Sequence, residues 1–366
     1  MFRQQRYPLS LIAALFVVAT LLAGCGAQGA ATAPTVAPTV APTTPTTATT
    51  GSAAAVDRTG WPEKFTVGFF GGDDAEKVLK DNEPLRVYLE KELGMPVEFF
   101  TGTSYSAVIE AMRAKRVDAM EVGPFAYVLA VQEAQAEALV VNTSEAGDVV
   151  KYNPDVPPHY YSAIIAKKGS GITTLADLKG KNFAFVDPAS TSGHLAPKTL
   201  LVKNNIDPDT EMKTVFAGSH PTAVLAVWNG SADAGATFEG NLYTLQKQGQ
   251  IEFCNFEDKQ IGKKRTPEEV KAIYDSCPAG QIAIIGMSDE IPSTPFAVRS
   301  DLPASFKATV KQLLLNVKDD AELVASLGQW YTDPSQEMGL ETLDQYYNSL
   351  RDIAKLLNLD LQELGG

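Results

Sequence analysis

Basic residues are scarce in this chain: 31 Lys and Arg stand against 44 Asp and Glu, which gives a formal net charge of −13. Loss of an N-terminal segment carrying Arg3 and Arg6 would leave 29 basic residues against 44 acidic ones, a charge of −15. Such a chain lacks the basic surface that displaces counterions from phosphates, so nucleic acid is excluded as a partner. An anionic ligand would have to be held by a local site, because the net charge does not attract it.

A run long enough to span a membrane is also missing at the N-terminus. The apolar run there, residues 9–22, has 14 residues, fewer than the ~20 that a membrane-spanning helix needs. Two arginines precede the run, and small residues lead from it to Cys25. This order resembles a bacterial lipoprotein signal, which implies a cleaved signal peptide (residues 1–24), a lipid on Cys25 and attachment to the membrane. An ordinary secretory signal with an incidental cysteine is the alternative, and both predict a mature chain outside the cytoplasm.

Charge is absent from residues 30–55, which consist mainly of Pro, Thr, Ala and Val. Such a composition cannot bury a core, and its prolines favour an extended coil. We therefore expect residues 25–60 to form a tether between the lipid and a folded body that begins near Trp61.

Cysteine is rare, with three in the chain. Once Cys25 is assigned to the lipid, Cys254 and Cys277 remain. Neither belongs to a CxxC motif and no histidine lies nearby in the sequence, so metal binding is the weaker interpretation. In an exported protein, an isolated pair of this kind predicts a disulfide.

The remaining ~300 residues suit two lobes of ordinary size. Short β-rich runs alternate with helical stretches in two series, separated by the Pro-rich segment NPDVPP. Strand–helix–strand order with short loops predicts a parallel sheet flanked by helices in each series. Lobe 1 is expected to comprise residues 61–166 and 295–366, and lobe 2 residues 167–294, with a cleft at the carboxyl ends of the strands. The expected helices are residues 73–93, 104–115, 125–136, 193–205, 220–229, 304–317, 321–327 and 340–357.

Three consecutive hydroxyl residues, Ser190, Thr191 and Ser192, lie between a strand broken by Asp187-Pro188 and a helix that begins near Gly193. A single hydroxyl is enough to cap a helix. The others would add donors beside the unpaired N–H groups and positive dipole of the helix N-terminus, which suits a tetrahedral oxyanion. The local chemistry therefore leaves two interpretations open, an N-cap with surplus hydroxyls and an anion-binding site.

The segment VDPASTSGHLAPKTLLVKNNIDP resembles the signature of the solute-binding proteins of phosphate, phosphite and phosphonate ABC transporters. Three more segments are similar to that family in the same order: GTSYSAVIEAMRAKRVDAMEVGPFAYVLA, AGSHPTAVLAVWNGSADAGATFEG and FAVRSDLP. The resemblance implies a type II periplasmic-binding-protein fold, with two α/β lobes that close on the ligand. It also implies a monomer without cofactor or catalysis, which binds a small phosphorus oxyanion and delivers it to an ABC transporter permease.

The same resemblance implies a set of ligand-binding residues. Glu239 stands where the family often has an acidic residue, with Gly240 as the other candidate, and His194 is left outside the set. Tyr105 and Tyr127 could instead be core aromatic residues. The expected ligand-binding residues are Ser190, Thr191, Ser192, Tyr105, Tyr127, His220 and Glu239.

Three other functions compete with this one. A metal-ion carrier could use His159, His194 and His220, although these lie in separate segments. A hydrolase could combine Ser192 with a histidine and Asp187, but the sequence has no G-x-S-x-G elbow. A ligand-sensing surface lipoprotein would need the same fold and anchor. The sequence does not choose among phosphate, phosphite, hypophosphite, methylphosphonate and an aminophosphonate.

Overall fold

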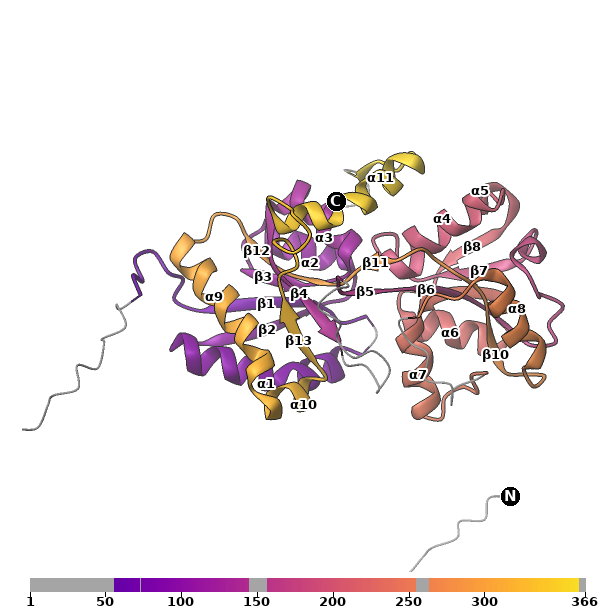
Figure 1. Cartoon of the computed structure of the whole chain (residues 1–366), viewed down its shortest axis with the longest axis horizontal. Helices are drawn as coiled ribbons and strands as arrows, with labels where there is room; N and C mark the ends of the chain where they lie inside the picture. Colours follow the sequence, from indigo (N-terminus) through magenta and orange to yellow (C-terminus); the bar gives the residue numbers. More distant parts are fainter. Residues whose placement is uncertain (1–55, 73, 145–156, 255–262, 362–366) are drawn as a thin grey trace, which may run out of the picture. The chain divides into compact units, whose positions relative to one another are not determined.

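The computed structural model describes residues 56–72, 74–144, 157–254 and 263–361. The signal peptide, Cys25 and the tether up to residue 55 therefore lie outside the described residues. Residues Val56–Gly366 form one compact unit (Figure 1). Among the described helices, none combines the length and the apolar character needed to cross a membrane.

Lobe 1 is built on a six-stranded sheet with the order β13-β4-β12-β3-β1-β2. Strands β2, β1 and β3 are parallel, whereas β12, β4 and β13 pair antiparallel. This sheet is therefore mixed, not parallel throughout as expected. Its strands are β1 (Phe65–Phe70), β2 (Val97–Gly102), β3 (Ala119–Glu121), β4 (Ala136–Ser144), β12 (Pro295–Arg299) and β13 (Gln329–Thr332).

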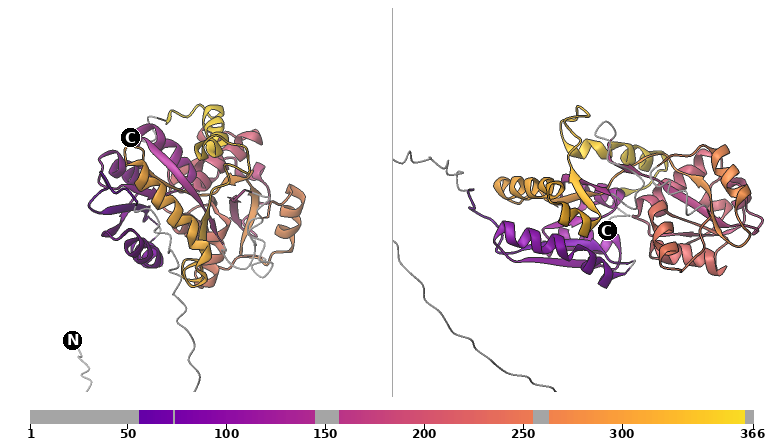
Figure 2. Two further views of the ribbon diagram at one scale, coloured as in Figure 1. Left: turned by 60° about the vertical axis from the view of Figure 1, so that its left-hand side comes forward. Right: turned by 60° about the horizontal axis from the view of Figure 1, so that its bottom comes forward.

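Helices cover both faces of this sheet. One face packs against α2 (Tyr105–Arg113), α3 (Pro124–Ala134) and α11 (Asn348–Leu356). The other packs against α1 (Ala75–Leu93), α9 (Ala304–Asn316) and α10 (Ala321–Leu327). The C-terminal elements from β12 to α11, drawn in light orange to yellow, therefore belong to the same lobe as the indigo N-terminal strands (Figures 1 and 2). Residues 340–357, expected as one helix, form the 3₁₀-helix η5 (Leu343–Tyr347) followed by α11.

Lobe 2 is built on a five-stranded sheet with the order β10-β6-β9-β7-β8. Strands β8, β7 and β9 are parallel, and β6 and β10 are antiparallel to their neighbours. The strands are β6 (Ser162–Lys167), β7 (Asn182–Phe185), β8 (Lys213–Phe216), β9 (Ala234–Phe238) and β10 (Ile282–Met287). The helices around it are η1 (Leu175–Leu178), η2 (Thr191–Leu195), α4 (Ala196–Lys203), α5 (Pro208–Glu211), α6 (His220–Asn229), α7 (Glu239–Lys247) and α8 (Pro267–Ser276).

The predicted disulfide is present in lobe 2. Cys254, which follows α7, is bonded to Cys277 at the end of α8, with their Cα atoms 5.5 Å apart. Both cysteines are buried. The bond therefore joins a loop to a helix end within one lobe.

Two short strands connect the lobes. β5 (His159–Tyr160) pairs antiparallel with β11 (Ile291–Pro292) in a separate two-stranded sheet. The chain enters the second sheet directly after β5, because β6 belongs to that sheet. The apolar run that was expected to close lobe 1 pairs, as β6, with β9 and β10. We therefore propose a first lobe boundary at β5 and keep the start of β12, at Pro295, as the second.

Candidate functional site

Ser190 is the N-cap of the helical segment that it precedes. Its Oγ accepts the backbone N–H of Gly193 at 3.0 Å, and the residue is almost fully buried. The segment begins as a π-helical turn, η2, and continues as α4. One of the three hydroxyls thus has the capping role that the sequence left open.

Thr191 caps a different helix. Its Oγ1 accepts the backbone N–H of Phe125 at 2.8 Å. Phe125 lies in the first turn of α3, whose N-cap is Gly123 and whose first residue is Pro124, so neither supplies a capping side chain. A hydroxyl from lobe 2 thus satisfies an amide at the start of a lobe 1 helix.

Ser192 lies beside a tyrosine that the sequence did not predict. The side chains of Ser192 and Thr191 lie close enough to the Tyr160 hydroxyl to lower its pKa. Burial raises the pKa of Tyr160 to about 12, although these two hydroxyls oppose the shift. The backbone carbonyl of Ser192 accepts a 2.6 Å hydrogen bond from Ser162 Oγ. Tyr160 belongs to the crossover strand β5, so the hydroxyl run contacts the connection between the lobes.

The capping role and the anion-binding role are compatible. A hydroxyl has one hydrogen to donate and two lone pairs that accept. When a lone pair of Ser190 or Thr191 accepts a backbone N–H, its hydrogen remains available to a neighbouring oxygen. The backbone therefore orients these hydroxyls without using up their hydrogens.

Asp187, at the start of the run, connects to the other lobe as well. Its carboxylate accepts the N–H of Ala189 at 2.8 Å, and the backbone of Tyr105, the first residue of α2, lies close enough to lower its pKa. Burial raises the pKa of Asp187, against the effect of these two backbone groups. The ring of Tyr105 stacks on Phe70, with centroids 4.1 Å apart and planes at 11°. The structure thus brings Tyr105 to the hydroxyl run through its backbone.

His220 begins α6 and is buried at the end of β9. Its Nδ1 lies 3.1 Å from Thr237 Oγ1, and its ring meets Phe238 edge-on at 4.8 Å. Burial lowers the pKa of His220 to about 3. The imidazole is therefore uncharged near neutral pH and would meet an anion as a neutral hydrogen-bonding group.

Glu239 is the first residue of α7, and its side chain is almost fully buried. Its negative charge contributes to raising the pKa of both Tyr160 and Tyr161. An acidic group in this position suits an ammonium or a protonated oxyanion. No sequence signal indicated that the charge of Glu239 acts on Tyr160.

Two residues considered from the sequence belong to the core. Tyr127 is fully buried in lobe 1, where its hydroxyl donates to Asp344 Oδ1 at 2.7 Å and its ring packs 4.9 Å from that of Tyr347. We therefore remove Tyr127 from the candidate site: helical spacing alone could not separate a core tyrosine from one in the cleft. His194 packs edge-on against Phe185 and Phe216, and Nδ1 lies 2.8 Å from the Pro188 carbonyl oxygen.

The described residues contain no group of three or more His, Cys, Asp or Glu side chains that could hold a metal ion. His159 lies on the crossover strand, where its Nδ1 is 2.9 Å from the Pro157 carbonyl oxygen. The three histidines considered above therefore have separate partners.

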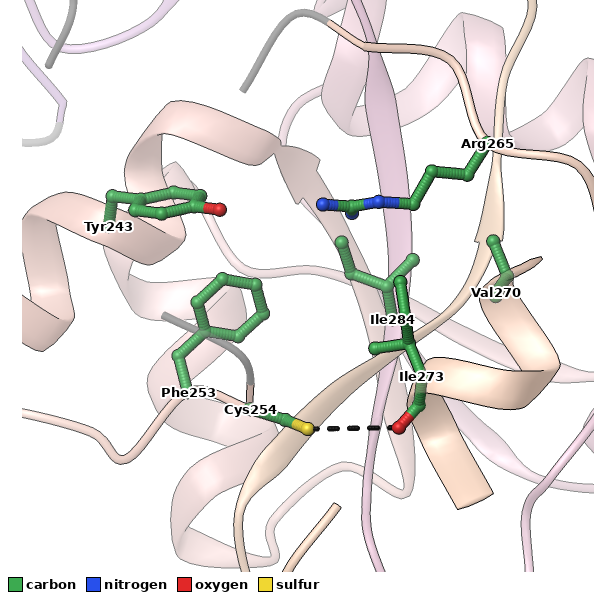
Figure 3. A pocket seen from close by; sticks show the side chains of 7 residues that line it. All are labelled: Tyr243, Phe253, Cys254, Arg265, Val270, Ile273 and Ile284. Atoms are coloured by element: carbon green, nitrogen blue, oxygen red, sulfur yellow. Dashed lines mark hydrogen bonds between the residues drawn. The ribbon is translucent and has the colours of Figure 1, made fainter. Parts of the chain in front are cut away.

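A further cavity lies beside the disulfide. It shares no residue with the hydroxyl cluster, which consists of Ser190, Thr191, Ser192 and Tyr160. In Figure 3 the Arg265 side chain extends above Ile284 toward Tyr243, and the Cys254 sulfur lies 4.0 Å from the Ile273 carbonyl oxygen. Because its other lining side chains are mainly apolar, this cavity is not part of the candidate site.

Comparison with known proteins identifies the family to which the chain belongs. Residues 67–339 match the family described as "ABC transporter, phosphonate, periplasmic substrate-binding protein". The phosphate-import protein PhnD of Mycolicibacterium smegmatis is 34% identical over 188 residues, which cover 49% of this chain and 56% of that protein. The phosphonates-binding periplasmic protein of Escherichia coli is 29% identical over 254 residues, which cover 68% of this chain and 64% of that protein. The chain thus spans less than two thirds of the length of either relative.

Solved structures show the same fold. The binding protein of an ABC phosphonate transporter from Pseudomonas aeruginosa superposes with a TM-score of 0.59 at 23% identity, covering 83% of this chain and 96% of that one. PhnD1 of Prochlorococcus marinus, solved in complex with methylphosphonate, gives a TM-score of 0.60 at 18% identity, covering 81% and 99%. The predicted type II periplasmic-binding-protein fold is confirmed.

Proposed function

The chain belongs to the family of periplasmic substrate-binding proteins of phosphonate ABC transporters, and from this premise we propose that it binds a phosphorus oxyanion between its lobes and delivers it to a permease. The ligand class is phosphate, phosphite or a phosphonate. The protein acts by binding and release and not by catalysis.

The hydroxyl cluster is the observation that carries this proposal. Thr191 and Ser192 lie close enough to Tyr160 to lower its pKa, and Ser190 and Thr191 have their lone pairs engaged by backbone amides. Hydroxyl hydrogens are thereby gathered at the start of η2, where the helix dipole favours negative charge. We assign Ser190, Thr191, Ser192 and Tyr160 to the oxygens of the anion.

Three further residues complete the proposed site. His220 supplies a neutral group because burial keeps its pKa low. Tyr105 contributes from the start of α2 in lobe 1. Glu239, which is buried and whose charge acts on Tyr160, would accept a hydrogen bond from a protonated oxyanion or from the ammonium of an aminophosphonate. Hydrogen bonds to a charged partner contribute ~1.5–3 kcal/mol each, so a few such donors give micromolar binding.

The cellular setting is proposed from the N-terminal sequence. Cleavage after residue 24 and a lipid on Cys25 would anchor the protein outside the cytoplasm, with residues up to about 60 as tether. The folded body would then reach an ABC transporter permease in the same membrane as a monomer. A permease and an ATPase encoded beside this chain would favour uptake over sensing.

A ligand screen tests the proposal. Calorimetry and thermal unfolding of the purified protein would be followed with phosphate, phosphite, hypophosphite, methylphosphonate and 2-aminoethylphosphonate. At least one should raise the melting temperature, because a ligand that binds only the native state stabilises it. Sulfate, as a tetrahedral oxyanion without phosphorus, and a neutral sugar serve as controls. Stabilisation by the sugar with no response to any phosphorus anion would overturn the assignment.

A further inference from the structure

One helix of lobe 1 has a first-turn amide that is satisfied by lobe 2, and a second helix begins beside the same loop. The amide of Phe125 in α3 donates to Thr191 Oγ1 at 2.8 Å, and the amide of Tyr105 in α2 lies close enough to Asp187 to lower the pKa of its carboxyl. The first amides of a helix have no partner within the helix. In α2 the N-cap Ser104 accepts the amide of Ala107 at 3.1 Å.

Burial makes these two contacts necessary. The side chain of Phe125 is fully buried and that of Tyr105 is 6% exposed, so bulk water has little access to the adjoining backbone. A buried N–H without an acceptor is unfavourable, so the loss of either acceptor should destabilise the native structure around that amide. The fit at α3 is close: a Cβ at the N-cap Gly123 would stand 3.4 Å from Thr191 Oγ1.

The loop that carries both acceptors is held in shape by its own bonds. The amide of Ser190 donates to the carbonyl of Asp187 at 3.0 Å, and Val186 donates to the carbonyl of Gly193 at 3.0 Å. Gly193 has no room for a side chain, because a Cβ there would lie 2.3 Å from the Val186 side chain. Asp187 and Thr191 therefore present their oxygens from a fixed loop, which limits the entropy lost when they meet lobe 1.

We propose that Thr191 is a positioning residue of an interlobe clasp, in which lobe 2 caps the α3 helix of lobe 1, and that Asp187 serves as the second acceptor, for the start of α2. The clasp holds the N-termini of these helices against the hydroxyl run. The amides of lobe 1 and the hydroxyls of lobe 2 then face the same small volume. Because both acceptors belong to the protein itself, the clasp needs no ligand.

The inference deepens the proposed function, since Thr191 is also assigned to the anion, so its test must not depend on binding. Amide hydrogen exchange followed by NMR, in buffer free of phosphorus anions, measures the protection of the two helix-start amides directly. In the parent, the amides of Tyr105 and Phe125 should be protected, although first-turn amides usually exchange freely. Thr191→Val should lower protection at Phe125 about 5- to 30-fold, the factor expected for one lost hydrogen bond, and leave Tyr105 unchanged.

Matched variants separate the clasp from a general loss of stability. Asp187→Ala should lower the protection of the Tyr105 amide and leave that of Phe125 unchanged. Thr191→Ser, which keeps the hydroxyl, should have the parental protection at Phe125. Thr199→Val is the control, because this buried threonine donates to the Leu195 carbonyl at 2.7 Å within lobe 2 and contacts neither amide. Unprotected Tyr105 and Phe125 amides in the parent would refute the clasp even if the protein bound phosphate. Equal effects of Thr191→Val and Thr199→Val at Phe125 would refute it too.

Discussion

Replacing Ser192 by alanine tests whether the hydroxyl run holds a ligand. Ser190 caps η2 through its bond to Gly193, whereas the Ser192 side chain lies near Tyr160, whose pKa it lowers. Ser192→Ala therefore removes a candidate donor and leaves the helix cap in place. The backbone carbonyl of Ser192, which accepts the bond from Ser162, is also retained.

The expected loss falls on binding and not on folding. One hydrogen bond to a charged ligand contributes ~1.5–3 kcal/mol, so affinity for the best phosphorus anion should fall roughly 10- to 150-fold. The melting temperature without ligand should change little, because the Ser190 cap, the Thr191 bond to Phe125 and the bond to the Ser192 carbonyl are all retained. Calorimetric dissociation constants and ligand-free melting curves measure the two effects separately.

A remote cap supplies the matched comparison. Thr266 caps α8 by accepting the amide of Glu269 at 3.2 Å, far along the chain from the hydroxyl run. Thr266→Ala should cost ~1 kcal/mol of folding stability and leave the affinity unchanged. If Ser192→Ala instead behaves like Thr266→Ala, with an early melt and parental affinity, the hydroxyl run is a helix cap and the proposed site is wrong.

Three further predictions follow from the described contacts. Burial lowers the pKa of His194 to about 4 and of His220 to about 3 from the ordinary value of 6.5, so the unfolded chain takes up protons that the native protein resists. The free energy of unfolding should be highest above pH 6.5 and should fall with acidification, by about 2 kcal/mol per histidine between about pH 7 and about pH 5. Urea unfolding should show a smaller fall in His194→Gln. An unchanged pH profile in this variant would contradict the assignment of the low pKa to His194. Reduction of the Cys254–Cys277 bond, which spans 23 residues, should lower the free energy of unfolding by about 3 kcal/mol; unfolding midpoints with and without reductant measure this, and equal midpoints would count against it. Tyr127→Phe, which deletes the hydroxyl bonded to Asp344, should cost ~1 kcal/mol of stability without changing affinity; a tenfold weaker ligand would return Tyr127 to the site.

Local signals were sufficient for much of the secondary structure. Helix α6 spans His220–Asn229 as predicted, because Ser219 caps its start and Gly230 ends it in the left-handed region at φ 79°. Helix α10 also has its predicted bounds, with Asp320 and Gly328 in the same roles. Strand β4 was not expected, because a helical pattern was expected to continue to residue 136. Helix α3 instead ends at Gln135, which has φ 53°, and β4 begins at the next residue.

The sequence by itself determined the disulfide pair and the hydroxyl run from residue types along the chain, and it indicated the class of protein through its resemblance to a known family. Only the tertiary structure decided which atoms those residues meet. Tyr160 joins the cluster because the crossover strand carries it there, and Tyr127 leaves it because Asp344, 217 residues away, accepts its hydroxyl. Thr191 caps a helix of the opposite lobe, 66 residues away. A cap or a turn is set by neighbours in the chain, whereas a buried polar group takes whichever partner packing brings within hydrogen-bond distance.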